Sequence, residues 1–251
     1  MAISDSHMHP TDCGTGQYYP GSDSAEILVG CTARASEWDI MSSLEDCRVV
    51  RSYGVHPWYP GEWGPEAEAR LKTILSEDRS AHVGEIGLDA KRGDLKDQVA
   101  PFEAQLSIAE SEDRIASIHM IGTEKEVLDI LRARPHGRII LHSYGSDSYA
   151  KPFAEEGCFF SISPRILSRS EVRVRRLMDA LPADRILIET DAPNTGRDFE
   201  GIGVFADRLS SISGMDGIAD AATANLRGLL DGRHGRPHEA DPRPGGPRQA
   251  A

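Results

Sequence analysis

The chain has 251 residues, in which 28 Lys and Arg face 40 Asp and Glu, so its formal net charge is −12 with His neutral. Hydrophobic residues make up 39% of the chain, and this share excludes a disordered protein of low hydrophobicity over most of the length. The acidic balance argues against a broad basic surface for nucleic acid, but it leaves room for a local site at which bound metal ions reverse the sign.

Apolar runs rich in β-forming residues recur along the chain and predict eight strands. In chain order they cover residues 2–4, 26–30, 49–55, 82–87, 115–119, 138–142, 158–163 and 185–190. Most of these runs are almost continuously apolar instead of alternating, which is typical of parallel strands that are buried on both faces.

Helical patterns lie between most of the predicted strands. They cover residues 35–47, 65–79, 98–113, 123–134, 170–181 and 218–230. Alternation of strands and helices indicates an α/β fold, with a parallel sheet covered by helices. About eight such units in roughly 250 residues favour a single-domain (β/α)8 TIM-type barrel, and an open doubly wound sheet is the alternative.

The barrel domain is predicted to cover residues 1–231, followed by a flexible tail over 232–251. The tail is rich in Gly, Pro and Arg and has no apolar periodicity, so we expect it to be disordered. The chain shows no secretory signal and no apolar run near the roughly 20 residues of a membrane helix. Its scattered cysteines form no CxxC pair, which favours free thiols in a reducing compartment. We therefore expect a cytoplasmic monomer without a membrane partner.

Histidine and acidic side chains gather at the ends of the predicted strands. His7 and His9 are two residues apart in an extended segment, so both imidazoles point to the same face. The other members of this set each follow or lie within a different strand: His56, Glu85, His119, His142 and Asp191. The carboxyl ends of barrel strands converge on one mouth, and a buried acid or histidine is costly unless it is paired or bound to metal. The pattern predicts a divalent-metal site with room for two ions about 3.5–4 Å apart.

Each of these residues also has a structural interpretation. The histidines could be hydrogen-bonded core residues, Glu85 could pair with a cation, and Asp191 could cap a loop. His56 fits a packed His-Pro-Trp turn as well as it fits a site. Supporting or structural roles are favoured for Asp89 and Glu189.

The motifs resemble the TatD family of metal-dependent hydrolases. The matching segments occur in the family's order: Asp5-Ser6-His7-Met8-His9, Gly54-Val55-His56-Pro57-Trp58, Gly84-Glu85-Ile86-Gly87-Leu88-Asp89, His142-Ser143-Tyr144-Gly145 and Glu189-Thr190-Asp191-Ala192-Pro193. The resemblance runs from about residue 3 to about residue 230. It implies a TIM-type barrel with two divalent metal ions that acts on phosphodiester bonds in DNA, and some members resemble deacylases of mischarged tRNA instead.

Carried over position by position, the resemblance assigns one ion to His7, His9, Glu85 and Asp191. It assigns the second ion to Glu85, His119 and His142, so that Glu85 bridges the two ions. Zn, Mn, Co, Ni and Fe suit this mixed ligand set, and Mg suits it less well. Glu85 and Asp191 are the expected catalytic residues, and Asp191 could accept the proton of the attacking water. The expected function is a 3'-5' exonuclease-type deoxyribonuclease that cleaves single-stranded DNA ends with a water activated by two metals.

The chain departs from the family pattern at a position that is expected to contact the phosphate of the substrate. The family usually has an Arg two residues after the fifth-strand histidine, where this chain reads His119-Met120-Ile121. Because Ile cannot make a bidentate phosphate contact, substrate binding is expected to depend on the metals and on other residues: His56, Arg165 and Tyr144. The alternative is a hydrolase of another ester or amide, such as a D-aminoacyl-tRNA deacylase. A second alternative is a non-catalytic, metal-stabilised barrel.

Overall fold

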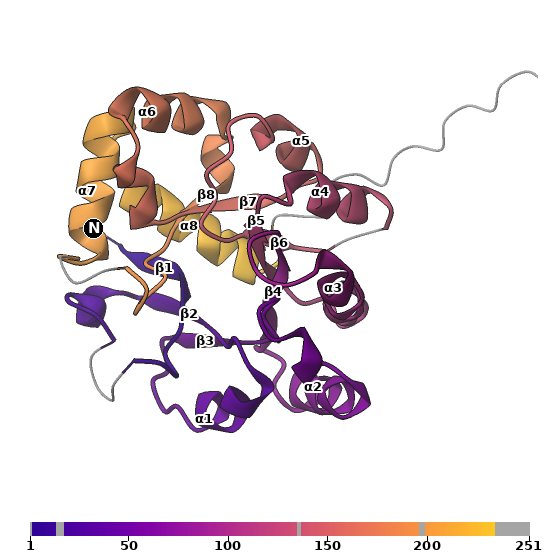
Figure 1. Cartoon of the computed structure of the whole chain (residues 1–251). Helices are drawn as coiled ribbons and strands as arrows, with labels where there is room; N and C mark the ends of the chain where they lie inside the picture. Colours follow the sequence, from indigo (N-terminus) through magenta and orange to yellow (C-terminus); the bar gives the residue numbers. More distant parts are fainter. Residues whose placement is uncertain (1, 14–17, 135–136, 196–198, 234–251) are drawn as a thin grey trace, which may run out of the picture.

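The computed structural model describes residues 2–13, 18–134, 137–195 and 199–233. It contains eight parallel strands, each paired with the next in chain order, which confirms the (β/α)8 barrel (Figure 1). The strands are β1 (Ser4–Met8), β2 (Ile27–Cys31), β3 (Val49–Tyr53), β4 (His82–Asp89), β5 (Ala116–Ile121), β6 (Ile139–Leu141), β7 (Phe159–Ile162) and β8 (Ile186–Ile188). The predicted tail lies outside the described residues from residue 234 onward.

Most of the helices lie around the outer side of the sheet (Figure 1). The helices are α1 (Trp38–Ser42), α2 (Pro65–Glu77), α3 (Leu95–Ser111), α4 (Glu124–Arg132), α5 (Ala150–Glu155), α6 (Glu171–Ala180), α7 (Ile202–Ser213) and α8 (Ile218–Leu230). Short 3-10 turns occur at Ser22–Ser24, Ala35–Glu37, Pro60–Glu62, Pro164–Ser168 and Ala183–Arg185. Helices α5 and α7 were not predicted; α5 has six residues and contains Pro152, so it shows no clear apolar period. The predicted helix over 35–47 is wrong in length, because the chain begins there as a 3-10 turn and α1 ends at Ser42.

Strand β1 lies further along the chain than predicted. Its five residues, Ser4–Met8, are all buried although most are polar, so hydropathy alone does not mark them as a strand. As a result, His7 lies within the strand and only His9 follows it. Strand β4 is likewise longer than predicted and carries Glu85 in its interior.

The first and last strands are joined by the segment that follows β8. The Asp191 N–H donates to the His7 carbonyl oxygen at 3.0 Å, and the His9 N–H donates to the Ala192 carbonyl oxygen at 2.7 Å. The buried Asp5 carboxylate accepts hydrogen bonds from the Thr190 N–H at 3.0 Å and the Thr190 hydroxyl at 2.6 Å. These bonds complete the barrel between β8 and β1 and fix Asp191 beside His7.

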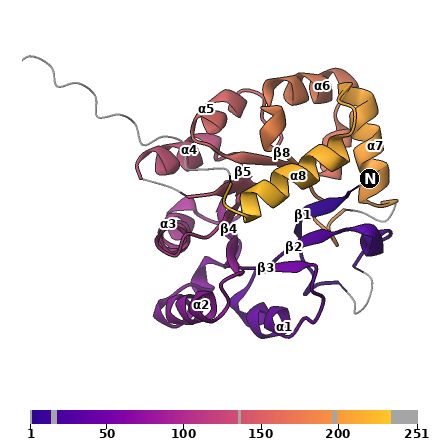
Figure 2. The same ribbon diagram turned by 180° about the vertical axis from the view of Figure 1, so that it is seen from behind.

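Helix α8 covers the opposite end of the barrel, where the strands begin (Figure 2). Leu226 and Leu229 pack against Val29, Ile115 and Leu187 in one buried apolar cluster. The Asn225 side-chain amide donates to the Ala183 and Ile186 carbonyl oxygens, both at 2.9 Å, and so ties the helix to the start of β8. This end of the interior is therefore closed by the helix.

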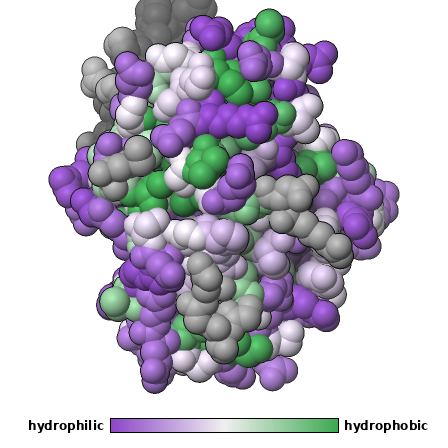
Figure 3. Space-filling view, turned by 90° about the vertical axis from the view of Figure 1, so that its left-hand side faces the viewer, coloured by the Kyte–Doolittle hydropathy of each residue, from purple (hydrophilic) through white to green (hydrophobic). Residues whose placement is uncertain are grey.

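The outer surface is mixed in character. On the side that carries α7, apolar side chains lie interspersed with polar and charged ones (Figure 3). Among the described residues, no helix combines the length and the apolar character needed to cross a bilayer.

His82, at the start of β4, gives the first prediction, which concerns acid stability. Burial, together with the charges of Arg138 and Arg114, lowers the pKa of His82 from 6.5 to about 3, and the Ile115 N–H donates to its Nδ1 at 3.3 Å. In the unfolded chain, His82 is protonated below about pH 6.5, whereas in the folded chain it stays neutral down to about pH 3. The free energy of unfolding therefore decreases as the pH falls through this window. Over the whole window the loss is on the order of 5 kcal/mol, at about 1.4 kcal/mol per pH unit.

Urea unfolding of wild type and His82→Asn between pH 7 and pH 4 tests this prediction. Asparagine keeps an acceptor near the position of Nδ1 but does not titrate, so we expect the free energy of unfolding of the variant to fall less steeply with acidification. Parallel curves for the two proteins would show that His82 does not contribute to acid sensitivity.

Candidate metal centre

Glu85 lies at the centre of a buried histidine cluster. It comes from the middle of β4 and is 2% exposed. Imidazole nitrogens of five histidines lie within 3.7 Å of its carboxylate oxygens: His7, His9, His56, His119 and His142. These side chains come from the carboxyl ends of four other strands, so the structure brings together residues that are far apart in the sequence.

One side of this cluster has the spacing of a metal-ligand set. The Nε2 atoms of His7 and His9 lie 3.4 Å apart, and they lie 3.4 and 3.3 Å from Glu85 Oε2. Ligand atoms on one tetrahedral ion with bonds of about 2.0–2.1 Å are separated by about 3.3 Å, so these three side chains fit a metal ion. Asp191 Oδ1 lies 3.6 Å from His9 Nε2 and completes the predicted first set.

The outer nitrogens of these histidines are held by the barrel. The Nδ1 atom of His9 lies 3.2 Å from the Cys31 carbonyl oxygen, to which it can only donate, and the Nδ1 atom of His7 lies 3.0 Å from Ser117 Oγ. The contact with the carbonyl oxygen leaves His9 Nε2 without a hydrogen, and the Nε2 atoms of both histidines face Glu85. Such outer contacts fix the tautomer and the ring orientation of metal-binding histidines.

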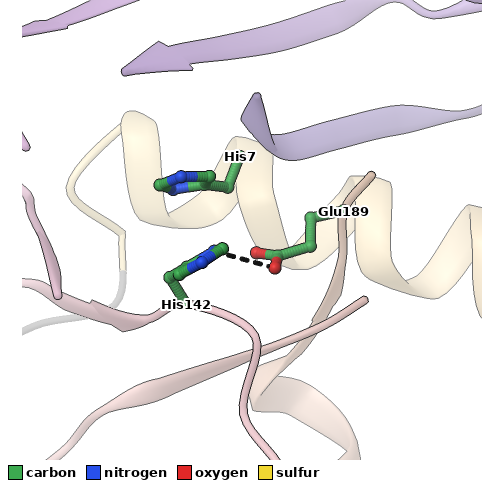
Figure 4. Close-up of side chains that lie close together, drawn as sticks. All are labelled: His7, His142 and Glu189. Carbon is green, nitrogen blue, oxygen red and sulfur yellow. Dashed lines mark ion pairs between the residues drawn. The ribbon is translucent and has the colours of Figure 1, made fainter. Parts of the chain in front are cut away.

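His142 is held in the same way by Glu189. Its Nδ1 atom forms an ion pair with Glu189 Oε1 at 2.9 Å, and its ring stacks on His7 with centroids 3.8 Å apart (Figure 4). The Nε2 atom of His142 faces Glu85 Oε1 at 3.7 Å. The Ser143 N–H also donates to Glu189 Oε1 at 2.9 Å, so the buried carboxylate of Glu189 fixes both the imidazole and the turn after β6.

The predicted ligands of the second ion, His119 and His142, approach the other carboxylate oxygen of Glu85, Oε1. The Nδ1 atom of His119 lies 2.8 Å from Glu85 Oε1, while its Nε2 atom lies 3.2 Å from Asp89 Oδ2. The Trp58 indole N–H donates to the same Asp89 oxygen at 2.7 Å. Asp89 therefore orients His119 so that Nδ1 is directed at Glu85, which is the supporting role favoured from the sequence.

His56 differs from the other four histidines in its hydrogen bonding. Its Nδ1 atom accepts the Trp58 backbone N–H at 3.1 Å, so the ring hydrogen is on Nε2, 3.3 Å from Glu85 Oε1. An imidazole with its hydrogen on Nε2 is a hydrogen-bond donor at that atom, and His56 also lies close enough to Glu85 and His119 for the three to share an ion. This geometry supports the predicted contact with substrate.

The charges of the cluster balance one another. Burial raises the pKa of Glu85, but the neighbouring histidines, His56 and His142 first, outweigh it and hold this pKa well below its usual value. Burial lowers the pKa of His142, but the charges of Glu189 and Glu85 raise it to about 9. Burial raises the pKa of Asp191, and the interaction with His9 outweighs it, so Asp191 is ionised. Metal binding would therefore release protons from the imidazoles.

A cavity of about 300 Å³ opens above these side chains. His9, His56, Glu85, His119, His142 and Asp191 line it together with Arg165. Arg165 is more than half exposed, and its guanidinium forms an ion pair with Asp191 Oδ2 at 2.9 Å.

Tyr144 does not reach this cavity, and its predicted contact with substrate requires correction. Its side chain is 2% exposed and packs edge-on against Phe160, with ring centroids 4.8 Å apart, and against Phe153. The aromatic residue after His142 and Ser143 therefore belongs to the core.

A family model described as TatD related DNase matches residues 5–202 of the chain. The chain belongs to this family. A protein of Erwinia tasmaniensis named 3'-5' ssDNA/RNA exonuclease TatD is 33% identical over 146 residues, which is 56% of this chain and 56% of that protein. A Mycobacterium tuberculosis protein named uncharacterized metal-dependent hydrolase TatD is 27% identical over 212 residues, or 75% of this chain and 79% of the relative.

Solved structures place the TatD chain in the same fold. The Escherichia coli TatD homologue YJJV superposes with a TM-score of 0.76 at 22% sequence identity and covers 91% of this chain and 98% of its own. A TatD family hydrolase of Entamoeba histolytica gives a TM-score of 0.72 at 15% identity, over 91% and 98% of the two chains. The resemblance expected from the motifs is thus confirmed at the level of family and fold.

Proposed function

We propose that this TatD-family chain is a metal-dependent hydrolase that removes nucleotides from the 3' end of single-stranded DNA. The observation that carries the proposal is the convergence of five histidines on the buried carboxylate of Glu85 at the floor of the cavity. A carboxylate and several imidazoles directed at one another are the ligand types that divalent transition-metal ions take. The names of the exonuclease relatives support the choice of bond.

Two groups of side chains would hold the ions. His7, His9, Glu85 and Asp191 form one group, and Glu85, His119 and His142 form the other, with Glu85 shared. Bound divalent ions lower the pKa of a water molecule and polarise a phosphoryl oxygen.

Proton transfer and substrate binding would depend on other side chains around the cavity. Asp191, ionised and 3% exposed, can accept the proton of the attacking water. His56 directs its Nε2–H into the cavity and can donate to the scissile group. Arg165 lines the cavity, and its exposed guanidinium can leave Asp191 to bind two non-bridging phosphate oxygens in a bidentate manner.

Arg165 thus takes the role that Ile121 cannot perform. Ile121 ends β5, and its backbone oxygen accepts the Ala90 N–H at 2.9 Å; its side chain carries no charge. A small cavity on a protein of net charge −12 suits the entry of one strand end better than the binding of a broad duplex, which needs a basic surface.

The lack of an arginine at position 121 favours one other function, the hydrolysis of an ester in D-aminoacyl-tRNA. Oligonucleotides labelled at the 5' end, D-aminoacyl-tRNA and a panel of divalent metals separate the two. Stepwise shortening of single strands from the 3' end supports the proposal, whereas deacylation without DNA cleavage replaces it. A protein that binds metal but cleaves neither substrate would support the remaining alternative, a non-catalytic barrel stabilised by metal.

His56→Ala provides the second prediction. Since we assign His56 as a donor to substrate and not as a metal ligand, we expect kcat/KM to fall by about 10- to 100-fold, in the range of one lost charge-assisted hydrogen bond, with unchanged metal content. His56→Gln can keep an N–H donor near the position of Nε2 and should recover part of the loss. Metal analysis and steady-state kinetics on the same preparations test this, and loss of metal from His56→Ala would identify His56 as a ligand instead.

A further inference from the structure

Trp58 separates the metal cavity from a second cavity. Both cavities are lined by Trp58 and Tyr59, and the second has a volume of about 260 Å³. Its other side is formed by the segment after β4 and the first turn of α3, with Arg92, Asp94 and Asp97. A chain-like substrate whose end occupies the first cavity would therefore pass Trp58 on its way to the second.

The indole ring of Trp58 is exposed and at the same time fixed in place. It is 44% exposed and lines both cavities, so part of the ring is open to a ligand. Its N–H donates to Asp89, and it contacts the His56 ring in a T-shaped arrangement with centroids 4.9 Å apart at 85°. A ring held in this way loses little conformational entropy when a ligand stacks on it.

Arg92 adds a cation to this ring. Its guanidinium carbon lies 4.4 Å from the centroid of Trp58, and in the described part of the chain no carboxylate pairs with it. Arg34, which lies over Tyr59, is by contrast paired with Glu62 at the surface. Arg92 and Trp58 together form a flat, cationic surface of the kind on which nucleobases stack.

The acidic side chains restrict what the second cavity can hold. Asp94 caps α3 by accepting the Lys96 N–H at 3.0 Å, and Asp97 follows in the first turn. Two carboxylates oppose a phosphate at this side, but they can accept hydrogen bonds from the amino groups of a base. The cavity is therefore suited to a base and not to the sugar-phosphate backbone.

We propose that the second cavity binds the base of the nucleotide next to the one that is removed, stacked on Trp58 and Arg92. This proposal rests on the proposed function, because it requires a nucleic-acid end in the metal cavity. It names the penultimate base as a determinant of binding, with little dependence on which base stands there, since every base offers a stacking face.

Oligonucleotides that differ only at the penultimate position test the proposal. We expect wild type to cleave a strand with an abasic penultimate residue about 10- to 100-fold less efficiently, in kcat/KM, than the intact strand. Arg92→Ala and Trp58→Leu should reduce this ratio to near one, and Trp58→Phe should retain most of it. Lys91→Ala removes a neighbouring exposed charge that does not line the cavity, so it should retain the full ratio.

A binding measurement separates stacking from catalysis. With the metal-free protein and 2-aminopurine at the penultimate position, we expect base stacking to quench the fluorescence in wild type and Lys91→Ala, and to do so much less in Trp58→Leu and Arg92→Ala. Cleavage of DNA with equal rates for the abasic and intact strands overturns this inference alone. A protein that cleaves no DNA end under any metal condition overturns the proposed function, and the inference with it.

Discussion

Glu85→Gln is expected to lose most of its bound metal and at least about a thousandfold in kcat/KM, because the ions provide several kcal/mol of transition-state stabilisation and each 1.4 kcal/mol is about tenfold in rate. Both oxygens of Glu85 lie among histidine nitrogens, at distances from 2.8 to 3.7 Å. An amide keeps the size and one acceptor oxygen, but it removes the charge that both metal groups share.

The fold should survive this substitution. A neutral glutamine at position 85 leaves no unpaired buried anion, and the histidines keep their outer contacts with Ser117, Cys31 and Glu189. Glu189→Gln is the matched control, because Glu189 is equally buried but contacts only His142 among the proposed ligands. It is expected to weaken metal affinity by about 10- to 100-fold. Metal analysis, circular dichroism and exonuclease assays decide the matter, and a fully active Glu85→Gln enzyme would contradict the two-metal assignment.

Asp191→Asn is expected to reduce kcat by about 10²–10⁴-fold, which is the usual contribution of a positioned proton acceptor. The asparagine oxygen can still face the metal group, since the backbone of residue 191 is held by the His7 carbonyl oxygen. The amide cannot take a proton, however. We therefore expect the loss to appear in kcat more than in metal content, measured on the same samples.

Asp12→Asn is the matched control for this substitution. Asp12 lines the same cavity and is exposed, so its replacement removes one negative charge without altering a proposed ligand. Its kcat should stay within about twofold of wild type, in keeping with a surface charge. An Asp191→Asn enzyme that turns over as fast as Asp12→Asn would show that Asp191 does not accept the proton.

The sequence predicts the barrel well where strands are buried on both faces. Runs such as residues 138–142 are apolar throughout and have little alternative to a central parallel strand. The exception is β1, in which the residues that line the barrel are polar because they serve the site. Apolar residues at these positions would have predicted the strand, but the site requires polar residues there.

The convergence of the candidate ligands was predicted from their places at strand ends, since barrel topology determines where those ends meet. The residues that hydrogen-bond to these ligands could not be predicted from the sequence. Ser117 and the carbonyl oxygen of Cys31 fix two imidazoles, yet a serine or a backbone oxygen has no distinctive sequence signal. Tyr144 shows the reverse error: its place after His142 resembles a site position, but the turn at Ser143, where φ is 47°, precedes a side chain that packs in the core.

The position of α8 has a consequence for synthesis on the ribosome. Val29 and Ile115 are made early, but their cover, Leu226 and Leu229, comes from the last described helix. Translation at about 5–20 residues per second therefore leaves these apolar side chains exposed to water for roughly 6–40 seconds before α8 is made. The nascent barrel must stay protected from aggregation during this interval, and its cleft can become rigid only once this final helix has left the exit tunnel.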